Sequence, residues 1–488
     1  MTMKIAGALG RNWSCRAVGF TAAFLLTVSL PCAGAAPGSR PVASAALAGQ
    51  VAPNTGGQLF TFFDEPMVNA SGQVAFLGNY AGGAGLFLKT NGPLSSVVVS
   101  GDTIPGLGTV TFASDSDIDG PAINNSGTVA FVVQGTNTQG VIQKKAAGSL
   151  TVLAKAGQAA PGTAGVFAAP ASNNVFDDIS QNNNDDVAFI ATYTDDAGVT
   201  YKTGVWLASG GTIVKIIAHG DAVPAGVVTC PNGFVSSGNS GDIDGPWMND
   251  LKVVVFLIDG PCGNDSSLGD HLLVKQPAQP LAAFVTEGDP APASIGGTMG
   301  GFKLGRPALN NSNTLAYRAV EIVGGSVTEA VVTHILGGSP VSCVNINANA
   351  PGTIGTLSGF VDTPPTINQT GTLAFAAAVL GDPNVSRGIF TCQSGTLKAI
   401  AFAGDPIPGT ATVFSNSIGE VSSGDGGLVA FLDDNSSPQG VFVSLLSQTA
   451  TPVPTLSEWA TISLAFLLAV LTGWRLRRQK ARPSEYDC

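Results

Sequence analysis

The sequence predicts an all-β fold, a seven-bladed β-propeller with four short strands in each blade, from three observations. First, a phrase of the form Asn-x-x-Gly-x-x-Ala-Phe recurs seven times, and its aromatic residue falls every 55 to 67 positions, at Phe76, Phe131, Phe189, Phe256, Tyr317, Phe375 and Phe431. Second, the composition, with 63 Gly, 30 Pro and only 11% charged residues, is typical of short strands and tight turns. Third, the two ends of the repeat region carry complementary parts of one repeat, as in a ring that closes on itself.

Each repeat divides into a turn and four strands, and the first copy illustrates this pattern. Asn69-x-x-Gly72 predicts a turn, because Asn bonds its own backbone and Gly tolerates a positive φ. A first strand follows at 74–77, and its unbroken apolar run is typical of a strand buried on both faces. A second strand lies at 85–88, a third ends at Gly101-Asp102, and a fourth begins at the lone Phe112 and runs to the next Asn.

The ends of the repeat region, residues 42–447, predict how the ring closes. The chain enters with material of the third and fourth strands, at 45–50 and 59–63. It leaves with material of the first and second strands, at 428–432 and 440–443. We expect these two halves to complete one blade, so that hydrogen bonds between the termini remove the exposed edges of an open stack.

Segments outside the repeats are expected to direct export. Residues 1–35 have the pattern of a signal peptide, with Lys4, Arg11 and Arg16 before an apolar stretch and Ala33-Gly34-Ala35 as the site for signal peptidase. A Thr/Pro linker at 448–453 leads to an apolar run expected to form a transmembrane helix at 456–474. The basic cluster after it places that end in the cytoplasm, so the repeats face the exported side of the inner membrane.

The C-terminal segment 454–482 resembles the IPTL-type sorting signals of Gram-negative bacteria. The resemblance lies in a hexapeptide followed by the apolar run and basic cluster, and the hexapeptide consists of Pro454, Thr455, Leu456, Ser457, Glu458 and Trp459. It implies that an exosortase-like membrane enzyme processes the tail, and that the protein is membrane-anchored or reaches the cell surface. The repeat phrase is similar to that of the bacterial choice-of-anchor tandem-repeat family named for NxxGxxAF, a resemblance that implies a class and a location but no chemistry.

The charge of the repeat region excludes one class of partner. Residues 41–450 contain 13 Lys and Arg against 30 Asp and Glu, a net charge of 13 − 30 = −17. Such a surface repels phosphate backbones, so we expect no binding to nucleic acid.

Aspartates at one phase of the repeat are the candidate binding residues. They stand five positions before the Asn in the first four repeats, at Asp64, Asp119, Asp177 and Asp244, and a shared Asp-Ile-Asp-Gly-Pro phrase adds Asp117 and Asp242. Equivalent positions on a ring lie at one height, so these carboxylates should form an arc, and clustered oxygen ligands suit Ca²⁺. The alternative is that each Asp caps backbone N–H groups in its own loop.

Four cysteines remain in the exported region: Cys230, Cys262, Cys343 and Cys392. An oxidising compartment favours two disulfides. Of three pairings we favour Cys230–Cys262 and Cys343–Cys392, because each pair falls in consecutive strands or their loops. A zinc site is the alternative, although no C-x-x-C spacing supports it.

The predicted function is that of an exported binding or adhesion module whose ligand is a surface polysaccharide or a protein. No catalytic set is visible, because the three histidines fall at unrelated phases and no G-x-S-x-G motif is present. The alternative is a propeller hydrolase or lyase acting on an extracellular polysaccharide, with two carboxylates of the arc facing each other. Trp206 and Trp247 are candidates to stack on a sugar, or else belong to the core.

Overall fold

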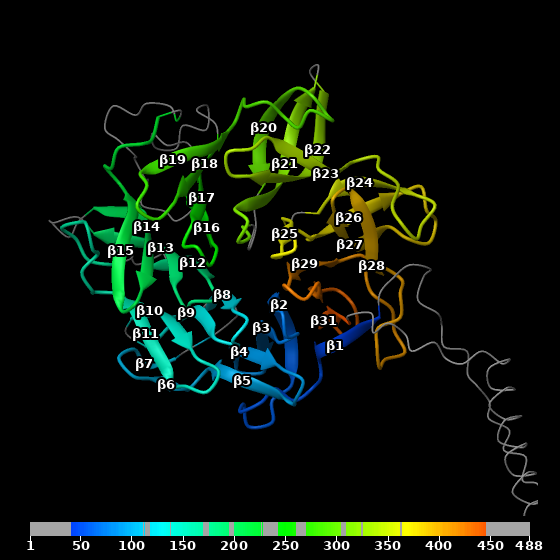
Figure 1. Ribbon diagram of the computed structural model, residues 1–488. Helices are drawn as coiled ribbons and strands as arrows, with labels where there is room; N and C mark the ends of the chain where they lie inside the picture. Colours follow the sequence, from blue (N-terminus) through cyan, green and yellow to red (C-terminus); the bar gives the residue numbers. More distant parts are fainter. Residues whose placement is uncertain are drawn as a thin grey trace, which may run out of the picture. The chain divides into compact units, whose positions relative to one another are not determined.

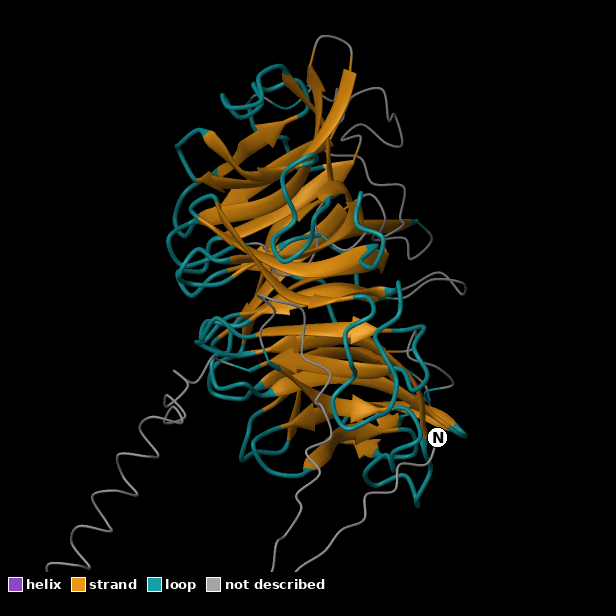
Figure 2. Cartoon of the chain, turned by 90° about the vertical axis from the view of Figure 1, so that its right-hand side faces the viewer, coloured by secondary structure: helices purple, strands orange, loops and turns teal. Residues whose placement is uncertain are grey.

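The computed structural model describes residues 41–445, except for 111, 113–117, 137, 169–174, 195–199, 226, 228–242, 260–269, 304–308, 324–325 and 362–363. Seven antiparallel sheets surround a central axis, as the sequence predicted (Figure 1). The described elements are strands and loops (Figure 2). Within these residues, no helix is long and apolar enough to cross a membrane. The predicted signal peptide, linker, sorting signal and transmembrane helix lie outside the described residues.

The blades follow one another along the chain, each with its innermost strand first. Blade 1 consists of β2 (Phe60–Val68), β3 (Val74–Tyr80), β4 (Gly83–Lys89) and β5 (Leu94–Val99). Blade 2 consists of β8 (Ile118–Ile123), β9 (Val129–Gln134), β10 (Gln139–Lys144) and β11 (Leu150–Lys155), after a small sheet of β6 (Thr103–Ile104) and β7 (Gly108–Thr109). Blade 3 consists of β12 (Phe176–Gln181), β13 (Val187–Thr194), β14 (Tyr201–Ser209) and β15 (Thr212–Ala218).

The remaining blades repeat this order. Blade 4 consists of β16 (Ile243–Met248), β17 (Val254–Asp259), β18 (Asp270–Lys275) and β19 (Leu281–Thr286). Blade 5 consists of β20 (Thr298–Lys303), β21 (Thr314–Val323), β22 (Ser326–Ile335) and β23 (Pro340–Asn345). Blade 6 consists of β24 (Thr356–Phe360), β25 (Thr366–Ile367), β26 (Leu373–Leu380), β27 (Arg387–Gln393) and β28 (Thr396–Phe402). Blade 7 consists of β29 (Ile418–Ser423), β30 (Val429–Asp433), β31 (Gly440–Ser444) and β1 (Val42–Leu47).

Closure of the ring depends on one N-terminal strand rather than two. β1 pairs with β31, so the termini do share a blade, but residues 59–63 lie at the start of blade 1. The expected division of the closing blade into two halves is therefore wrong. Each fourth strand of a repeat is the innermost strand of the following blade, so the last blade lacks only its outermost strand.

The apolar runs form the core because each blade packs between two neighbours. Along β3, the side chains of Val74 to Leu77 are at most 1% exposed, which confirms burial on both faces. Across the sheet, Phe76 lies opposite Phe87, and the two rings stack with centroids 6.0 Å apart. Phe60 meets Phe87 edge-on at 4.7 Å, and similar aromatic groups occur in blades 3, 6 and 7.

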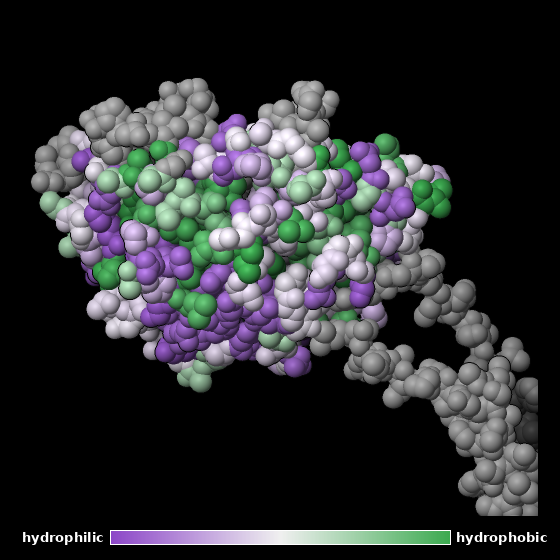
Figure 3. Space-filling view, turned by 45° about the horizontal axis from the view of Figure 1, so that its top comes forward, coloured by the Kyte–Doolittle hydropathy of each residue, from purple (hydrophilic) through white to green (hydrophobic). Residues whose placement is uncertain are grey.

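The lone Phe residues whose side chains the structure describes are buried, but the prediction that each begins a strand is wrong for some of them. Phe112 precedes β8, which begins at Ile118, and Phe414 precedes β29, which begins at Ile418. The visible outer face of the propeller carries hydrophilic residues interspersed with hydrophobic ones, as expected for a surface in water (Figure 3).

The Asn of each repeat performs the predicted local role and a second one. Its Oδ1 accepts hydrogen bonds from the backbone N–H groups two and four residues on, at 2.9–3.1 Å in six blades. Its Nδ2 donates at 2.9–3.3 Å to the backbone oxygen of the equivalent residue on the next blade. We call this second bond the inter-blade latch. The residues concerned are Asn69, Asn124, Asn182, Asn249, Asn310 and Asn368.

The seventh position of this series is Gly424, which has no side chain to form a latch. A Cβ at this position would lie 2.6 Å from the backbone oxygen of Asn69. The two blades therefore approach too closely at this junction for a larger residue. Elsewhere the turn tolerates substitution of its Gly, since Lys252 and Asn313 keep left-handed φ angles of 59° and 56°.

One disulfide lies within the described residues, between Cys343 and Cys392. The predicted pairing is confirmed, but its reasoning is wrong, because Cys343 lies on β23 of blade 5 and Cys392 on β27 of blade 6. The bond therefore joins neighbouring blades across a separation of 49 residues. Closing a loop of that size contributes about 4 kcal/mol in the chain-entropy model. Cys230 and Cys262 lie outside the described residues.

Candidate ligand-binding site

The inner strands of several blades carry a β-bulge at the same height. The register shifts directly after Asp64 in β2, Asp177 in β12, Asp244 in β16 and Gly419 in β29. A bulge bends its strand and redirects the side chain of the extra residue. At these four bulges the extra residue has a positive φ angle, and three of the four residues are acidic: Glu65 (49°), Asp178 (22°), Gly245 (97°) and Glu420 (41°).

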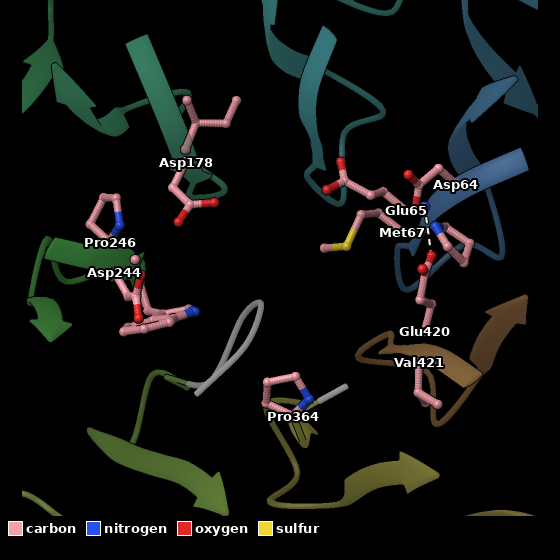
Figure 4. Close-up of a pocket in the computed structure, with 13 residues that line it drawn as sticks. Asp64, Glu65, Met67, Asp178, Asp244, Pro246, Pro364, Glu420 and Val421 are labelled. Atoms are coloured by element: carbon pink, nitrogen blue, oxygen red, sulfur yellow. Dashed lines mark hydrogen bonds between the residues drawn. The ribbon is translucent and has the colours of Figure 1, made fainter. Parts of the chain in front are cut away.

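These bulges surround one cavity of about 360 Å³ near the axis. Figure 4 shows Asp178 and Asp244 on one side of it, on blades 3 and 4. Glu65, Asp64 and Glu420, from blades 1 and 7, lie on the other side, with Pro364 of the loop that precedes β25 below them in this view. Among the described residues, the lining contains five carboxylate side chains and no Lys, Arg or His. We call this end of the channel the acidic end.

The structure divides the predicted aspartates. Asp64 and Asp244 line the cavity, whereas Asp177 is not among its lining residues. Asp64 and Asp177 each accept a hydrogen bond from the next residue's backbone N–H, at 2.9 and 3.0 Å, so the alternative of local capping holds for both. Asp117 and Asp242 lie outside the described residues, as does the side chain of Asp119.

Three acidic lining residues were not singled out from the sequence. Glu65, Asp178 and Glu420 stand four positions before the repeat Asn or its equivalent, one position after the aspartates singled out. Acidic residues at that phase are a visible signal, but Gly120 and Gly245 occupy it in other repeats, and a bulge with a left-handed residue is not evident from the residue types alone.

The pKa of Glu420 is raised by its surroundings. Burial raises the pKa of its carboxyl above the ordinary value for Glu, and the charges of Glu65 and Asp434 act in the same direction. Its Oε2 accepts a hydrogen bond from the backbone N–H of Glu65 at 3.0 Å. The carboxyl also hydrogen-bonds to that of Asp64, which offsets part of the rise in its pKa.

The two tryptophans have different roles. Trp206 is fully buried and donates from Nε1 to the backbone oxygen of Pro161 at 3.0 Å, so it belongs to the core, as the alternative had it. Trp247 lines the cavity and is 3% exposed. Its Nε1 is buried and has no hydrogen-bond partner within the described part of the chain.

The expected calcium site is not found among the residues that the structure describes. In that part of the chain no group of three or more His, Cys, Asp or Glu is placed to hold a metal ion. The alternative of a zinc site is wrong for Cys343 and Cys392, because they form the disulfide.

The opposite end of the axial channel, at the Asn turns, is filled with hydrogen bonds. In six of the seven repeats, the side-chain oxygen of the residue after the Asn or its equivalent accepts a hydrogen bond from a backbone N–H of the preceding blade, at 2.6–3.0 Å. These residues are Asn125, Asn183, Asp250, Asn311, Gln369 and Asp425. Asn125 reaches past the small Ala70 to Asp425 at 2.5 Å. A cavity of about 90 Å³ lies beside this ring, and Met67 lines both cavities.

Comparison with solved structures finds several distant likenesses. The β-propeller domain of the Trilobed protease from Pyrococcus furiosus is 10% identical with a TM-score of 0.45, over 79% of this chain and 93% of that one. An acylaminoacyl peptidase from Pyrococcus horikoshii has the same identity and TM-score, over 79% of this chain and 51% of that one, so the chain spans about half its length. An α-L-arabinofuranosidase from Fusarium graminearum is 11% identical with a TM-score of 0.34, over 69% of this chain and 95% of that one.

Comparisons by sequence are more specific. No curated protein matches the chain. An IPTL-CTERM motif matches residues 451–478, which confirms the sorting signal expected there. The resemblance to the choice-of-anchor repeat family stays a prediction. A family model described as a family of unknown function, DUF7453, matches residues 35–236 and again residues 231–443, so that together the two matches cover the propeller. The chain therefore belongs to the DUF7453 family.

Proposed function

We propose that this protein is an exported, surface-sorted propeller that binds an extracellular ligand, a polysaccharide or a protein, in the acidic cavity. The observation that carries the proposal is the convergence of Glu65, Asp178 and Glu420 on one cavity from left-handed bulge positions. A left-handed residue other than Gly costs about 1–2 kcal/mol. Gly245 occupies the same bulge in blade 4, so the fold itself does not require acidic residues there.

The course of the chain in blade 7 supports access to this cavity. Ser444 at the end of β31 pairs with Val42, and both lie level with the Asn-turn end of the blade, where β29 gives way to β30. Gly440 pairs with Asp433 at the other end, near Glu420. The chain therefore leaves the propeller at the end opposite the acidic cavity.

Binding is tested with the full-length protein in detergent micelles on an array of soluble bacterial and plant polysaccharides and exported proteins. Asp178→Asn combined with Asp244→Asn should abolish binding. Glu287→Gln is the matched control, since Glu287 is an exposed acid on blade 4, outside the cavity, with one long hydrogen bond of 3.3 Å. Absence of any binding, or binding that the double variant leaves unchanged, contradicts the proposal.

Sorting is tested separately in cells that carry an exosortase-like enzyme. The wild-type tail should be processed, and mass spectrometry should then detect a shorter mature protein. A variant with Pro454→Ala and Glu458→Ala should retain its full mass. Equal processing of both forms would contradict the role assigned to the hexapeptide.

One observation favours a second candidate function, hydrolysis or lysis of a polysaccharide. Glu420 has a raised pKa and lies across the cavity from Asp178 and Asp244 (Figure 4). A carboxyl with a raised pKa that faces other carboxyls across a cavity is an arrangement of acid and base used by glycosidases. Release of reducing ends or unsaturated products, lowered about a hundredfold or more by Glu420→Gln, would support this candidate. Binding with no product release would leave the protein a binding module.

A further inference from the structure

We infer that the acidic cavity binds an N-acetylated hexosamine of a polysaccharide, whose acetamido oxygen accepts a hydrogen bond from the indole of Trp247. This inference rests on the proposed function and specifies its ligand. It follows from an unsatisfied donor on the wall of the cavity, from the apolar surroundings of that donor, and from the hydrogen-bond acceptors that line the rest of the wall.

The unsatisfied donor is the indole N–H of Trp247. The side chain lines the cavity and is 3% exposed, yet its Nε1 has no hydrogen-bond partner within the described residues. A buried indole N–H normally finds a partner, and leaving it without one costs free energy. A ligand that supplies an acceptor to this N–H therefore gains a hydrogen bond that the free protein lacks.

The bulge of blade 4 makes room for this indole. Gly245 occupies the position at which three other blades have an acid, and a Cβ there would lie 2.7 Å from Cζ3 of Trp247. The ring therefore takes the space that a side chain at the bulge would need, and both residues line the cavity. Blade 4 supplies an aromatic donor to the wall where blades 1, 3 and 7 supply carboxylates.

The surroundings of Trp247 favour an acceptor that brings no polar hydrogen of its own. The side chain packs in an apolar cluster of blades 4 and 5 that includes Val255, Met299 and Leu309. A hydroxyl oxygen would carry its own O–H into these surroundings, where an unpaired donor is costly. An acetamido carbonyl oxygen only accepts, and the methyl group beside it adds apolar contact.

Acceptors outnumber N–H donors on the wall. Among the described lining residues, five side chains are carboxylates and that of Trp247 is the one with an N–H. The carboxylates already take part in other interactions, but each has about four lone-pair sites and can accept a further hydrogen bond. The ring hydroxyls and the acetamido N–H of a sugar can donate to them without any charge on the ligand. A peptide, with one N–H for each carbonyl, matches such a wall less well.

The size and the apolar part of the lining also suit a sugar. The cavity volume of about 360 Å³ falls within the range of ligand pockets, roughly 300–1,000 Å³. Apolar side chains can contact the ring carbons and the acetyl methyl group, and they belong to Pro66, Met67, Ile179, Pro246, Pro364 and Val421.

The test compares two β-1,4-linked tetramers that differ only in the group on C2, the acetamido group of N-acetylglucosamine and the hydroxyl of glucose. Full-length protein in detergent is titrated with each by calorimetry. The N-acetylglucosamine tetramer should bind at least about tenfold more tightly, and salt should change this advantage little because neither ligand is charged. Trp247→Phe, which keeps an aromatic ring but removes the N–H, should abolish most of the advantage. Trp206→Phe, which removes an indole N–H from the core, should leave it unchanged.

A second measurement uses the wild type alone, so it does not depend on the folding of a variant. In saturation-transfer NMR, the acetyl methyl protons of the bound N-acetylglucosamine tetramer should receive the strongest saturation from the protein. Weaker saturation there than at the ring protons would contradict the placement of the acetamido group. The unfolding midpoint checks the folding of each variant used in the titrations.

The alternative outcomes separate this inference from the proposed function. Equal binding of the two tetramers, lost when Asp178→Asn and Asp244→Asn are combined, would overturn the selection for an acetamido group and leave the proposed function intact. Binding of another polysaccharide or of an exported protein through the cavity, with neither tetramer bound, would do the same. An advantage that Trp247→Phe leaves unchanged would overturn the role of the indole. Tetramer binding that neither Trp247→Phe nor the double variant weakens would overturn both the inference and the cavity as the binding site.

Discussion

The two ends of the axial channel are built from the same inner strands, yet they use those strands in opposite ways. At the Asn-turn end, six of seven blades place the same residue in the same turn, with side chains only 2–4% exposed and bonded to the next blade. At the acidic end, the equivalent bulge residues differ from blade to blade, as Glu65, Asp178, Gly245 and Glu420 illustrate. The recurring Asn residues hold the ring together, whereas the candidate site combines the recurring Asp64 and Asp244 with bulge residues that differ between blades.

The energetic contrast between the ends is as sharp as the compositional one. The Asn turns satisfy backbone groups that would otherwise be buried without partners, which stabilises the fold. The acidic bulges hold left-handed residues and concentrate like charges, which destabilises it. Substitutions at the two ends should therefore change stability with opposite signs.

The largest effect is expected from Asn249→Ala at the Asn-turn end. The change leaves the backbone N–H groups of Leu251 and Val253 without their acceptor and removes the latch to Asn310. We expect the free energy of unfolding, measured in urea, to fall by about 2–4 kcal/mol. Leu251→Ala, in the same turn at an exposed side chain, should change it by less than about 0.5 kcal/mol. Similar losses in both variants would contradict the role of the latch.

A smaller loss of stability is expected from a substitution at Gly424, where the latch is missing. On the present backbone, the Cβ introduced by Gly424→Ala would lie 2.6 Å from the backbone oxygen of Asn69, so blades 1 and 7 must separate to accommodate it. We expect a loss of about 1–3 kcal/mol in the free energy of unfolding. Gly427→Ala is not a suitable control because its φ is 74°, so Gly359→Ala, which has open space around it and no positive φ, serves instead. An unchanged stability for Gly424→Ala would show that the junction adapts.

At the acidic end the sign should reverse. Glu65→Gly relieves a left-handed residue and removes a charge beside Glu420, so we expect a gain of about 0.5–1 kcal/mol in the free energy of unfolding. The same substitution at Glu287, which has no positive φ, should cost about 0.5–1 kcal/mol. A loss at Glu65 equal to that at Glu287 would mean that the bulge stores no strain.

The smallest effect concerns pH. The raised pKa of Glu420 means that the folded state binds the carboxyl proton more tightly than the unfolded state does. In the unfolded state the carboxyl has the ordinary pKa of 4.5. The carboxyl therefore costs no stability below that pH, and stability is lost as the pH rises through the folded pKa. Glu420→Gln, which keeps an acceptor for the Glu65 N–H, should match the wild type at low pH and exceed it by about 1 kcal/mol or less at neutral pH. Unfolding midpoints measured across that range check the trend, and a constant difference would contradict it.

The sequence predicted the parts of this molecule that repeat. Seven aromatic positions at a near-constant spacing indicated seven blades, and the unbroken apolar run before Phe76 indicated a strand covered on both sides. The inter-blade latch was missed because an Asn that caps its own turn looks the same in sequence whether or not its Nδ2 reaches the next blade. The innermost strand was assigned to the wrong blade because the phrase that marks a repeat begins after it.

The candidate site was only half predicted for a related reason. Asp64 and Asp244 were singled out because they recur, yet recurrence marks structural residues, and Asp177 caps its own bulge. The acids one position further on, Glu65, Asp178 and Glu420, are exceptions to the pattern. Their importance depends on a bulge geometry that brings residues more than 100 positions apart in the sequence around one cavity. A search for recurring residues overlooks such exceptions.

The most direct test of this division of roles is to measure two properties on the same two variants. Affinity for the tightest ligand found and the free energy of unfolding are determined for Asp178→Asn and for Asn249→Ala, the latter under conditions where it is folded. The account predicts that Asp178→Asn weakens binding about tenfold or more while stability changes by less than about 0.5 kcal/mol, and that Asn249→Ala loses stability while it keeps its affinity. The reverse pattern, or equal effects of both variants on both properties, would contradict it.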